Sequence, residues 1–118
     1  MTAYALAHFR DSRPHVDLIA YVERIQATLD PYAGRFLVHG GAPDVVEGEW
    51  RGSVVMIEFP GRAEAEAWYA SPAYQEILPL RTDHVVGDIV IVDGVGPNYD
   101  PAQKAAVFRE ALAAEAAA

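Results

Sequence analysis

The order of apolar and polar positions along the chain predicts four short strands. Residues 53–59 are apolar on both faces around Val-Val-Met-Ile, which is typical of a central strand that is covered on both sides. Residues 3–9 alternate small and large side chains, and residues 35–39 and 88–92 are two further short strands, which end at Gly40-Gly41 and at Asp93-Gly94. These four segments are predicted to pair in one sheet.

Segments with helical spacing of apolar residues separate the predicted strands. An apolar stripe recurs at helical spacing after the first strand, at Leu18, Tyr21, Val22, Ile25 and Leu29. This helix is predicted to end at Asp30, because Pro31 disfavours helical backbone in the residue before it. Residues 62–70 form a second helical segment, and Ser71 followed by Pro72 is a helix start. Pro79 is predicted to bend or end that last helix.

The resulting order is strand, helix, strand, strand, helix, strand. This order is the ferredoxin-like split βαβ pattern, an α+β fold in which an antiparallel sheet carries two helices on one face. Residues 1–96 are predicted to form this domain and residues 97–118 a C-terminal helical extension. Phe108 and Leu112 lie on the narrow apolar stripe of the extension, and its last residues are predicted to fray.

The second face of the predicted sheet has no helix to cover it. Apolar residues from every strand fall on this face, and each Å² left in water forfeits roughly 25 cal/mol. Pairing two sheets face to face in a twofold arrangement would bury the apolar area. We therefore predict a homodimer that forms a dimeric α/β barrel.

Composition limits the classes of partner. The 118 residues carry a net charge of −8, which argues against nucleic acid as a partner because binding it requires Lys and Arg to neutralise phosphates. The absence of cysteine excludes disulfides, thiolate metal sites and cysteine nucleophiles. No apolar run is long enough to span a bilayer, and the first residues do not resemble a secretory signal. A soluble cytoplasmic protein with no membrane partner is expected.

Several motifs resemble, in order and with their spacing, the family called domain of unknown function 1330. They are Tyr-Ala-Gly-Arg-Phe-Leu-Val at 32–38 followed by Gly40-Gly41, Glu-Gly-Glu-Trp at 47–50, Ile-Glu-Phe-Pro at 57–60, Ala-Trp-Tyr at 67–69 and Ser-Pro-Ala-Tyr-Gln at 71–75. The resemblance covers about residues 3–94. His39 departs from the family pattern, which more often has arginine before the glycine pair, and Gly61 replaces a serine that usually caps the next helix.

The resemblance implies membership of the dimeric α/β-barrel superfamily. That superfamily includes cofactor-free monooxygenases, muconolactone isomerases, haem-dependent dismutases and ligand-sensing regulator domains. The family itself has no settled activity, so the resemblance implies the fold and leaves the function open.

Polar residues on the predicted strands are the candidate catalytic groups. His8, His39 and Glu58 are expected to point into one cavity, with Arg35 on the same strand face as His39. A histidine beside a carboxylate can act as a general base, because its pKa is near neutral. This hypothesis assigns catalysis to His39 and Glu58 and ligand binding to Arg35. The alternative is that each is a strand-end or solvent-facing residue with an ordinary hydrogen bond.

Aromatic and cationic residues are the candidate ligand-binding groups. Four aromatic side chains could wall a pocket for a flat ligand or, alternatively, anchor helices on the sheet: Trp50, Trp68, Tyr69 and Tyr74. Arg81 and His84 follow the last helix and could hold a carboxylate, or they are a solvated helix end. The four histidines lack a tight ligand spacing, so neither a metal site nor a cofactor is predicted.

Three functions remain compatible with the sequence. The first is binding of a small organic ligand, aromatic or carboxylate, between sheet and helices. The second is a cofactor-independent monooxygenase or isomerase in which His39 or His84 is the base and Arg35 or Arg81 steadies the anion. The third is a structural interaction module that uses the C-terminal helix as a hook. Whether the protein is an enzyme is left open.

Overall fold

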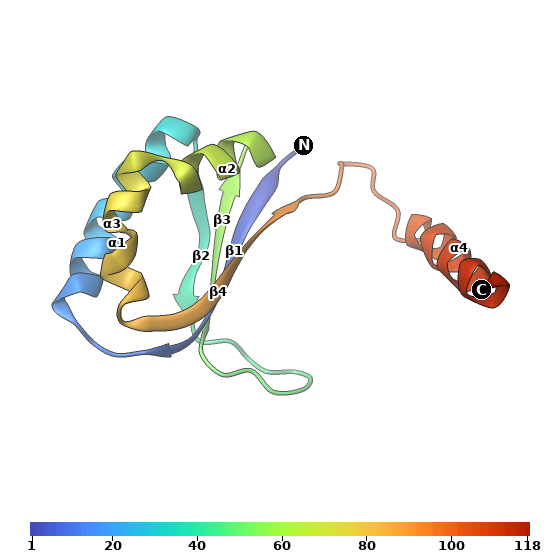
Figure 1. Cartoon of the computed structure of the whole chain (residues 1–118), viewed down its shortest axis with the longest axis horizontal. Helices are drawn as coiled ribbons and strands as arrows, with labels where there is room; N and C mark the ends of the chain where they lie inside the picture. The colour runs from blue at the N-terminus through green and yellow to red at the C-terminus, as the bar shows by residue number, and fades with distance from the viewer.

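One antiparallel sheet of four strands organises the computed structural model, which describes residues 1–118 (Figure 1). The strands are β1 (Ala3–Ser12), β2 (Arg35–Gly41), β3 (Ser53–Phe59) and β4 (Val85–Asp93). They lie in the order β2-β3-β1-β4, and every neighbouring pair is antiparallel. The predicted α+β, ferredoxin-like fold is confirmed.

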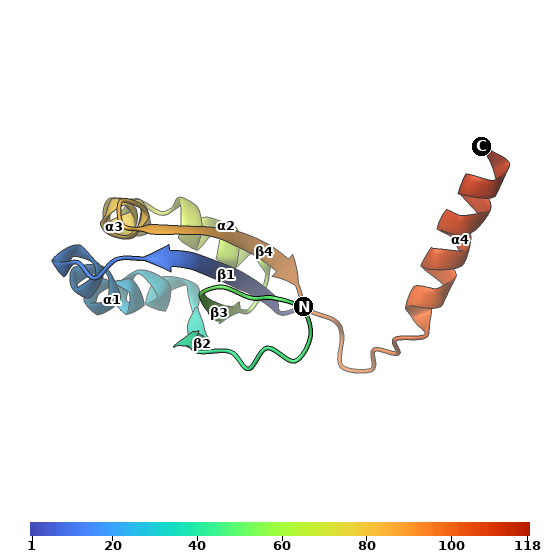
Figure 2. The same ribbon diagram turned by 90° about the horizontal axis from the view of Figure 1, so that it is seen from below.

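Helices cover one face of this sheet (Figures 1 and 2). They are α1 (Val16–Leu29), followed by the single 3-10 turn Asp30–Tyr32, then α2 (Arg62–Ala70) and α3 (Pro72–Thr82). Helix α3 starts as predicted, because the Ser71 hydroxyl accepts the Tyr74 N–H at 3.2 Å. Of the two effects predicted for Pro79, an end of the helix is wrong, because α3 continues to Thr82. The last turn persists because the Pro79 carbonyl accepts the Asp83 N–H at 3.1 Å.

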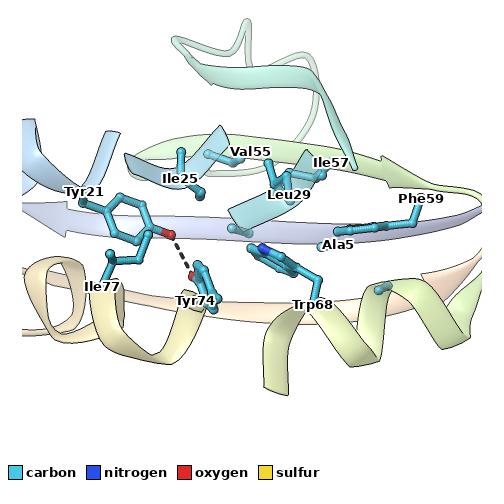
Figure 3. Close-up of a cluster of buried hydrophobic side chains, with 12 residues drawn as sticks. Ala5, Tyr21, Ile25, Leu29, Val55, Ile57, Phe59, Trp68, Tyr74 and Ile77 are labelled. Atoms are coloured by element: carbon cyan, nitrogen blue, oxygen red, sulfur yellow. Dashed lines mark hydrogen bonds between the residues drawn. The ribbon is translucent and has the colours of Figure 1, made fainter. Parts of the chain in front are cut away.

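The core lies between the helices and the sheet (Figure 3). Its largest fully buried side chains come from three elements and the end of β3: Trp68, Tyr74, Phe59, Leu29 and Ile77. The indole N–H of Trp68 donates to the Thr28 hydroxyl at 3.0 Å, so burial leaves this polar atom satisfied. Trp68 and Tyr74 therefore anchor the helices on the sheet.

The other face of the sheet is open and largely apolar. Alternation along β1 puts Tyr4, Leu6 and His8 on this face, while Ala3, Ala5 and Ala7 are buried on the helix side. Among the exposed apolar residues of the sheet are Val38, Val86, Val90 and Val92. An apolar area of this kind is uncommon on a protein that acts as a monomer.

Helix α4 (Gln103–Ala117) stands apart from the rest of the chain in both views (Figures 1 and 2). None of its residues is buried, and Val107, Phe108 and Leu112 are exposed. The helix continues to Ala117. Neither α4 nor any other helix combines the length and the apolar character that crossing a bilayer requires.

Candidate functional site

A small apolar cavity lies between the sheet and the helices. Its volume is about 30 Å³, which is room for one or two water molecules. The lining side chains are apolar or aromatic except for one histidine: Ala5, Ala7, Phe9, Tyr21, Ile25, Phe36, His39, Val55, Ile57, Trp68, Tyr74 and Ile89. Such a cavity can accept an apolar group of at most a few atoms.

A wider hollow adjoins this cavity and shares four lining residues with it: Phe9, Tyr21, His39 and Val55. The hollow has a volume of about 220 Å³. Polar groups reach it from Ser12, Ser53 and Arg81, beside the apolar side chains of α1. We call this hollow the Arg81 hollow. It combines an adjoining apolar cavity, a polar rim and a buried charge.

Arg81 is a buried cation without a carboxylate partner. The residue is only 6% exposed, yet no Asp or Glu lies within ion-pair distance of it, and its Nε has no hydrogen-bond partner. Its guanidinium carbon instead lies 5.0 Å from the centre of the Phe9 ring and 5.7 Å from that of Tyr21. Cation–π contacts offset part of the cost of removing the charge from water. A buried charge without a counter-ion remains costly, and an anion would relieve that cost.

Two tyrosines place a pair of hydroxyl groups beside this charge. The hydroxyl oxygens of Tyr21 and Tyr74 lie 2.7 Å apart, as the dashed line in Figure 3 marks. Burial, reinforced by Tyr74, raises the pKa of the Tyr21 phenol far above its ordinary value, although Arg81 opposes the shift. The Tyr21 hydroxyl therefore keeps its proton near neutral pH. The hydrogen bond between the two tyrosines uses one hydroxyl proton, so the proton of the other hydroxyl can be donated to another acceptor.

His39 faces the helices because β2 is irregular. The register shifts between Phe36 and Val38, which places His39 opposite Val55 on the buried side. Arg35 lies opposite Glu58, and its Nε donates to Glu58 Oε1 at 2.8 Å on the open face. The expected common cavity for His39 and Glu58, and the common face for His39 and Arg35, are therefore wrong. A β-bulge inverts the alternation on which both expectations rested.

The remaining predicted residues lie elsewhere. His8 is on the open face, where its ring stacks on Trp50 with ring centres 4.0 Å apart. Tyr69 lines a groove between α2, α3 and β4, and Arg81 also reaches that groove. His84 turns away from the Arg81 hollow and contacts Asp17 Oδ2 through Nε2 at 2.9 Å. Four of the ten candidate residues thus line the cavity or the adjoining hollow, namely His39, Trp68, Tyr74 and Arg81.

Sequence reasoning missed the role of Tyr21. This residue was part of the apolar stripe of the first helix, and nothing in that stripe distinguishes a tyrosine that packs from one that also offers a hydroxyl. A tyrosine within an otherwise aliphatic stripe is a weak signal, because a buried hydroxyl needs a polar partner. Here that partner is Tyr74, 53 positions away in the sequence.

Residues 2–95 match the family model described as "Domain of unknown function (DUF1330)". The chain belongs to this family. The resemblance seen in the sequence motifs is therefore confirmed, and the DUF1330 match includes every residue of the Arg81 hollow. No curated protein matches the DUF1330 chain.

Solved structures similar to this DUF1330 protein share its fold. A protein of unknown function from Rhodopseudomonas palustris superposes with a TM-score of 0.63 at 16% identity, covering 81% of this chain and 84% of the other. A variant of SnoaB, a cofactor-independent oxygenase from Streptomyces nogalater, gives 0.57 at 7% identity, covering 84% and 98%. A dimeric ferredoxin-like protein of unknown function from Jannaschia gives 0.51 at 15% identity, covering 80% and 100%. At these identities the likeness extends to the fold alone.

Proposed function

We propose that the protein binds a small organic carboxylate in the Arg81 hollow. The observation that supports this most strongly is the buried Arg81 guanidinium, which has no acidic partner in the chain. Guanidinium and carboxylate match in charge and in planar geometry, and their hydrogen bonds are among the strongest in proteins. The free proton of the Tyr21–Tyr74 pair offers a further donor to a carboxylate oxygen.

The volumes limit the size of the ligand. A cavity of about 150 Å³ can hold benzene, so the inner cavity of about 30 Å³ cannot accept a ring. The Arg81 hollow, at about 220 Å³, can accept one. The ligand that fits is an acid with one ring or a short chain, its carboxylate on Arg81 and its apolar part against Phe9, Leu18 and Val22.

Replacing Arg81 by methionine is expected to weaken binding of such acids and to leave the fold intact. The substitution keeps the apolar stem and removes an unpaired buried charge, so stability should not fall. Loss of a charged hydrogen bond weakens binding by roughly 10- to 100-fold. A thermal-shift screen of aromatic and short-chain acids, with the matching amides beside them, measures both effects.

The matched control is Arg35→Met, which removes an arginine that is paired with Glu58 on the opposite face of the sheet. This variant should keep the stabilisation by acids. Equal stabilisation by acids and amides, or the same response in the two arginine variants, would rule out carboxylate recognition by Arg81.

The proposed binding unit is a homodimer that pairs the open faces of two sheets. Support comes from the exposed valines of that face and from the description of the Jannaschia neighbour as dimeric. Burying apolar area contributes roughly 25 cal/mol per Å² to the free energy of association. A twofold axis pairs the same patch of one subunit with that of the other.

A charge placed on the open face is expected to yield monomers. Val90 is 52% exposed there, and Val90→Asp would bury an unpaired carboxylate at the proposed interface. Ile19→Asp is the control, because Ile19 is 60% exposed on α1, on the other side of the protein. Sedimentation velocity at micromolar concentration should find monomers only for Val90→Asp. A monomeric parent protein would refute the dimer.

A second candidate function is cofactor-independent oxygenation, because His39 lines the Arg81 hollow and could take a proton from a phenolic acid held there. Glu58 cannot assist, since it lies on the opposite face. His39→Ala is then expected to abolish oxygen uptake while acid binding persists. Oxygen electrode measurements with phenolic acids decide this, and uptake that survives the substitution excludes His39 as the base.

A further inference from the structure

Three side chains with metal-ligating atoms meet where α1 begins and α3 leads into β4. They are His15, Asp17 and His84, and one ligand atom from each lies within 4.8 Å of the other two. We infer that this cluster, which we call the His15–His84 site, binds a divalent transition-metal ion such as Zn²⁺. It shares no residue with the Arg81 hollow, so the two proposals stand or fall separately.

The distances suit a small ion. Asp17 Oδ2 lies 2.9 Å from His84 Nε2 and 3.5 Å from His15 Nδ1. Ligand bonds to Zn²⁺ of about 2.0–2.1 Å place neighbouring ligand atoms of a tetrahedral site roughly 3.3 Å apart, between these two values. The two imidazoles are stacked with ring centres 3.8 Å apart and planes inclined by 16°. A turn of one ring is therefore needed to point both nitrogen lone pairs at one ion.

Backbone contacts fix the segments that carry the site. His15 is the N-cap of α1, and its Nδ1 accepts the Asp17 N–H at 3.0 Å, a hydrogen bond that an ion bound at this nitrogen would replace. The Arg13 N–H donates to the His84 carbonyl at 3.3 Å, which ties the two segments together. His84 is largely buried and Asp17 and His15 are partly exposed, so an ion can enter from solvent.

The charge balance of the cluster favours a cation. Asp17 forms contacts with histidines only and has no Lys or Arg partner, so its negative charge is uncompensated when both imidazoles are neutral. The N-terminus of α1 carries a partial positive charge of about half a unit, which opposes an ion there, and the carboxylate outweighs it. Two imidazole nitrogens and one carboxylate oxygen form a ligand set that Zn²⁺ uses.

A hollow next to His84 leaves room for further ligands. It has a volume of about 400 Å³ and is lined by Asp11, Ser12, Arg13, His84 and Val86. Three protein ligands with an open position are typical of zinc sites that hold water or a small anion. Sequence spacing does not reveal this site, because His15 and His84 come from opposite ends of the domain.

Isothermal titration of the full, tag-free, EDTA-treated protein with Zn²⁺ or Co²⁺ tests the inference. We expect one ion per chain, a thermal shift to higher temperature and, with Co²⁺, visible absorption bands. His15→Ala, His84→Ala and Asp17→Asn should each weaken binding by more than about tenfold, the lower limit for losing even an indirect support of a metal.

The chain supplies its own controls, since its other two histidines lie outside the site. His8→Ala and His39→Ala should bind the ion as the parent does. No binding to the parent protein, or binding that survives both His15→Ala and His84→Ala, would overturn the inference. Should His84→Ala fail to fold, the His15→Ala variant decides, because His15 is exposed and its truncation opens no buried void.

Discussion

Replacing Trp68 by alanine is expected to lower the free energy of unfolding by about 3–5 kcal/mol. Trp68 is 1% exposed and packs on Phe59 and Tyr74, with ring centres 5.5 and 4.2 Å away. The substitution would leave a large void between α2 and the sheet and would remove the donor that bonds to the Thr28 hydroxyl. Urea denaturation monitored by circular dichroism measures the loss.

Trp50 provides the matched control for this prediction. It is the only other tryptophan and is 44% exposed in the loop between β2 and β3. Trp50→Ala loses the stack on His8 but opens no buried void, so a change within about 1 kcal/mol is expected. Similar losses in the two variants would mean that Trp68 is not the packing centre of the domain.

Gly52→Ala is expected to destabilise the domain by about 2–5 kcal/mol. A Cβ at this position would lie 1.9 Å from the carbonyl oxygen of Phe9, and the backbone has φ +102°, which side chains rarely adopt. The clash is with the backbone of β1, at the point where β3 begins beside it. No side-chain rotation can relieve such a contact, so the strands must move apart.

Gly48→Ala separates the clash from the backbone conformation. Gly48 also has a positive φ, +78°, but a Cβ there would meet nothing within 4 Å. Its expected cost is therefore the conformational cost alone, roughly 1–2 kcal/mol. Equal losses for Gly48→Ala and Gly52→Ala in urea titrations would show that β1 does not approach Gly52 so closely.

The fold could be predicted because local signals agree with it. The apolar runs, the helix stripe and the Ser71–Pro72 start each indicate the same order of elements. The prediction that Pro79 could end α3 is wrong, because the Pro79 carbonyl still accepts the Asp83 N–H and the helix continues to Thr82. The first and last strands are longer than predicted, since pairing in the sheet extends both beyond their apolar runs.

The candidate site was less predictable, because it depends on register and on distant contacts. Regular alternation along β2 predicts that His39 and Glu58 share one face of the sheet. A bulge in β2 puts them on opposite faces, and this bulge leaves no local signal in the sequence of the strand. The sequence predicts that Arg81 could hold a carboxylate, but its burial and its lack of a partner follow only from the packing of Phe9 and Tyr21 around it. The meeting of His15 with His84 is likewise a product of tertiary structure.

The two outer strands of the sheet differ in regularity, and this has a consequence for aggregation. Strand β2 has two register shifts, and such irregular edges discourage pairing with another sheet. Strand β4 pairs only with β1, leaving its other edge free of strands along the run Ile-Val-Ile-Val at 89–92. Asp88 and Asp93 bracket that run as charged gatekeepers. Neutralising both would turn β4 into the edge from which fibrillar assembly begins.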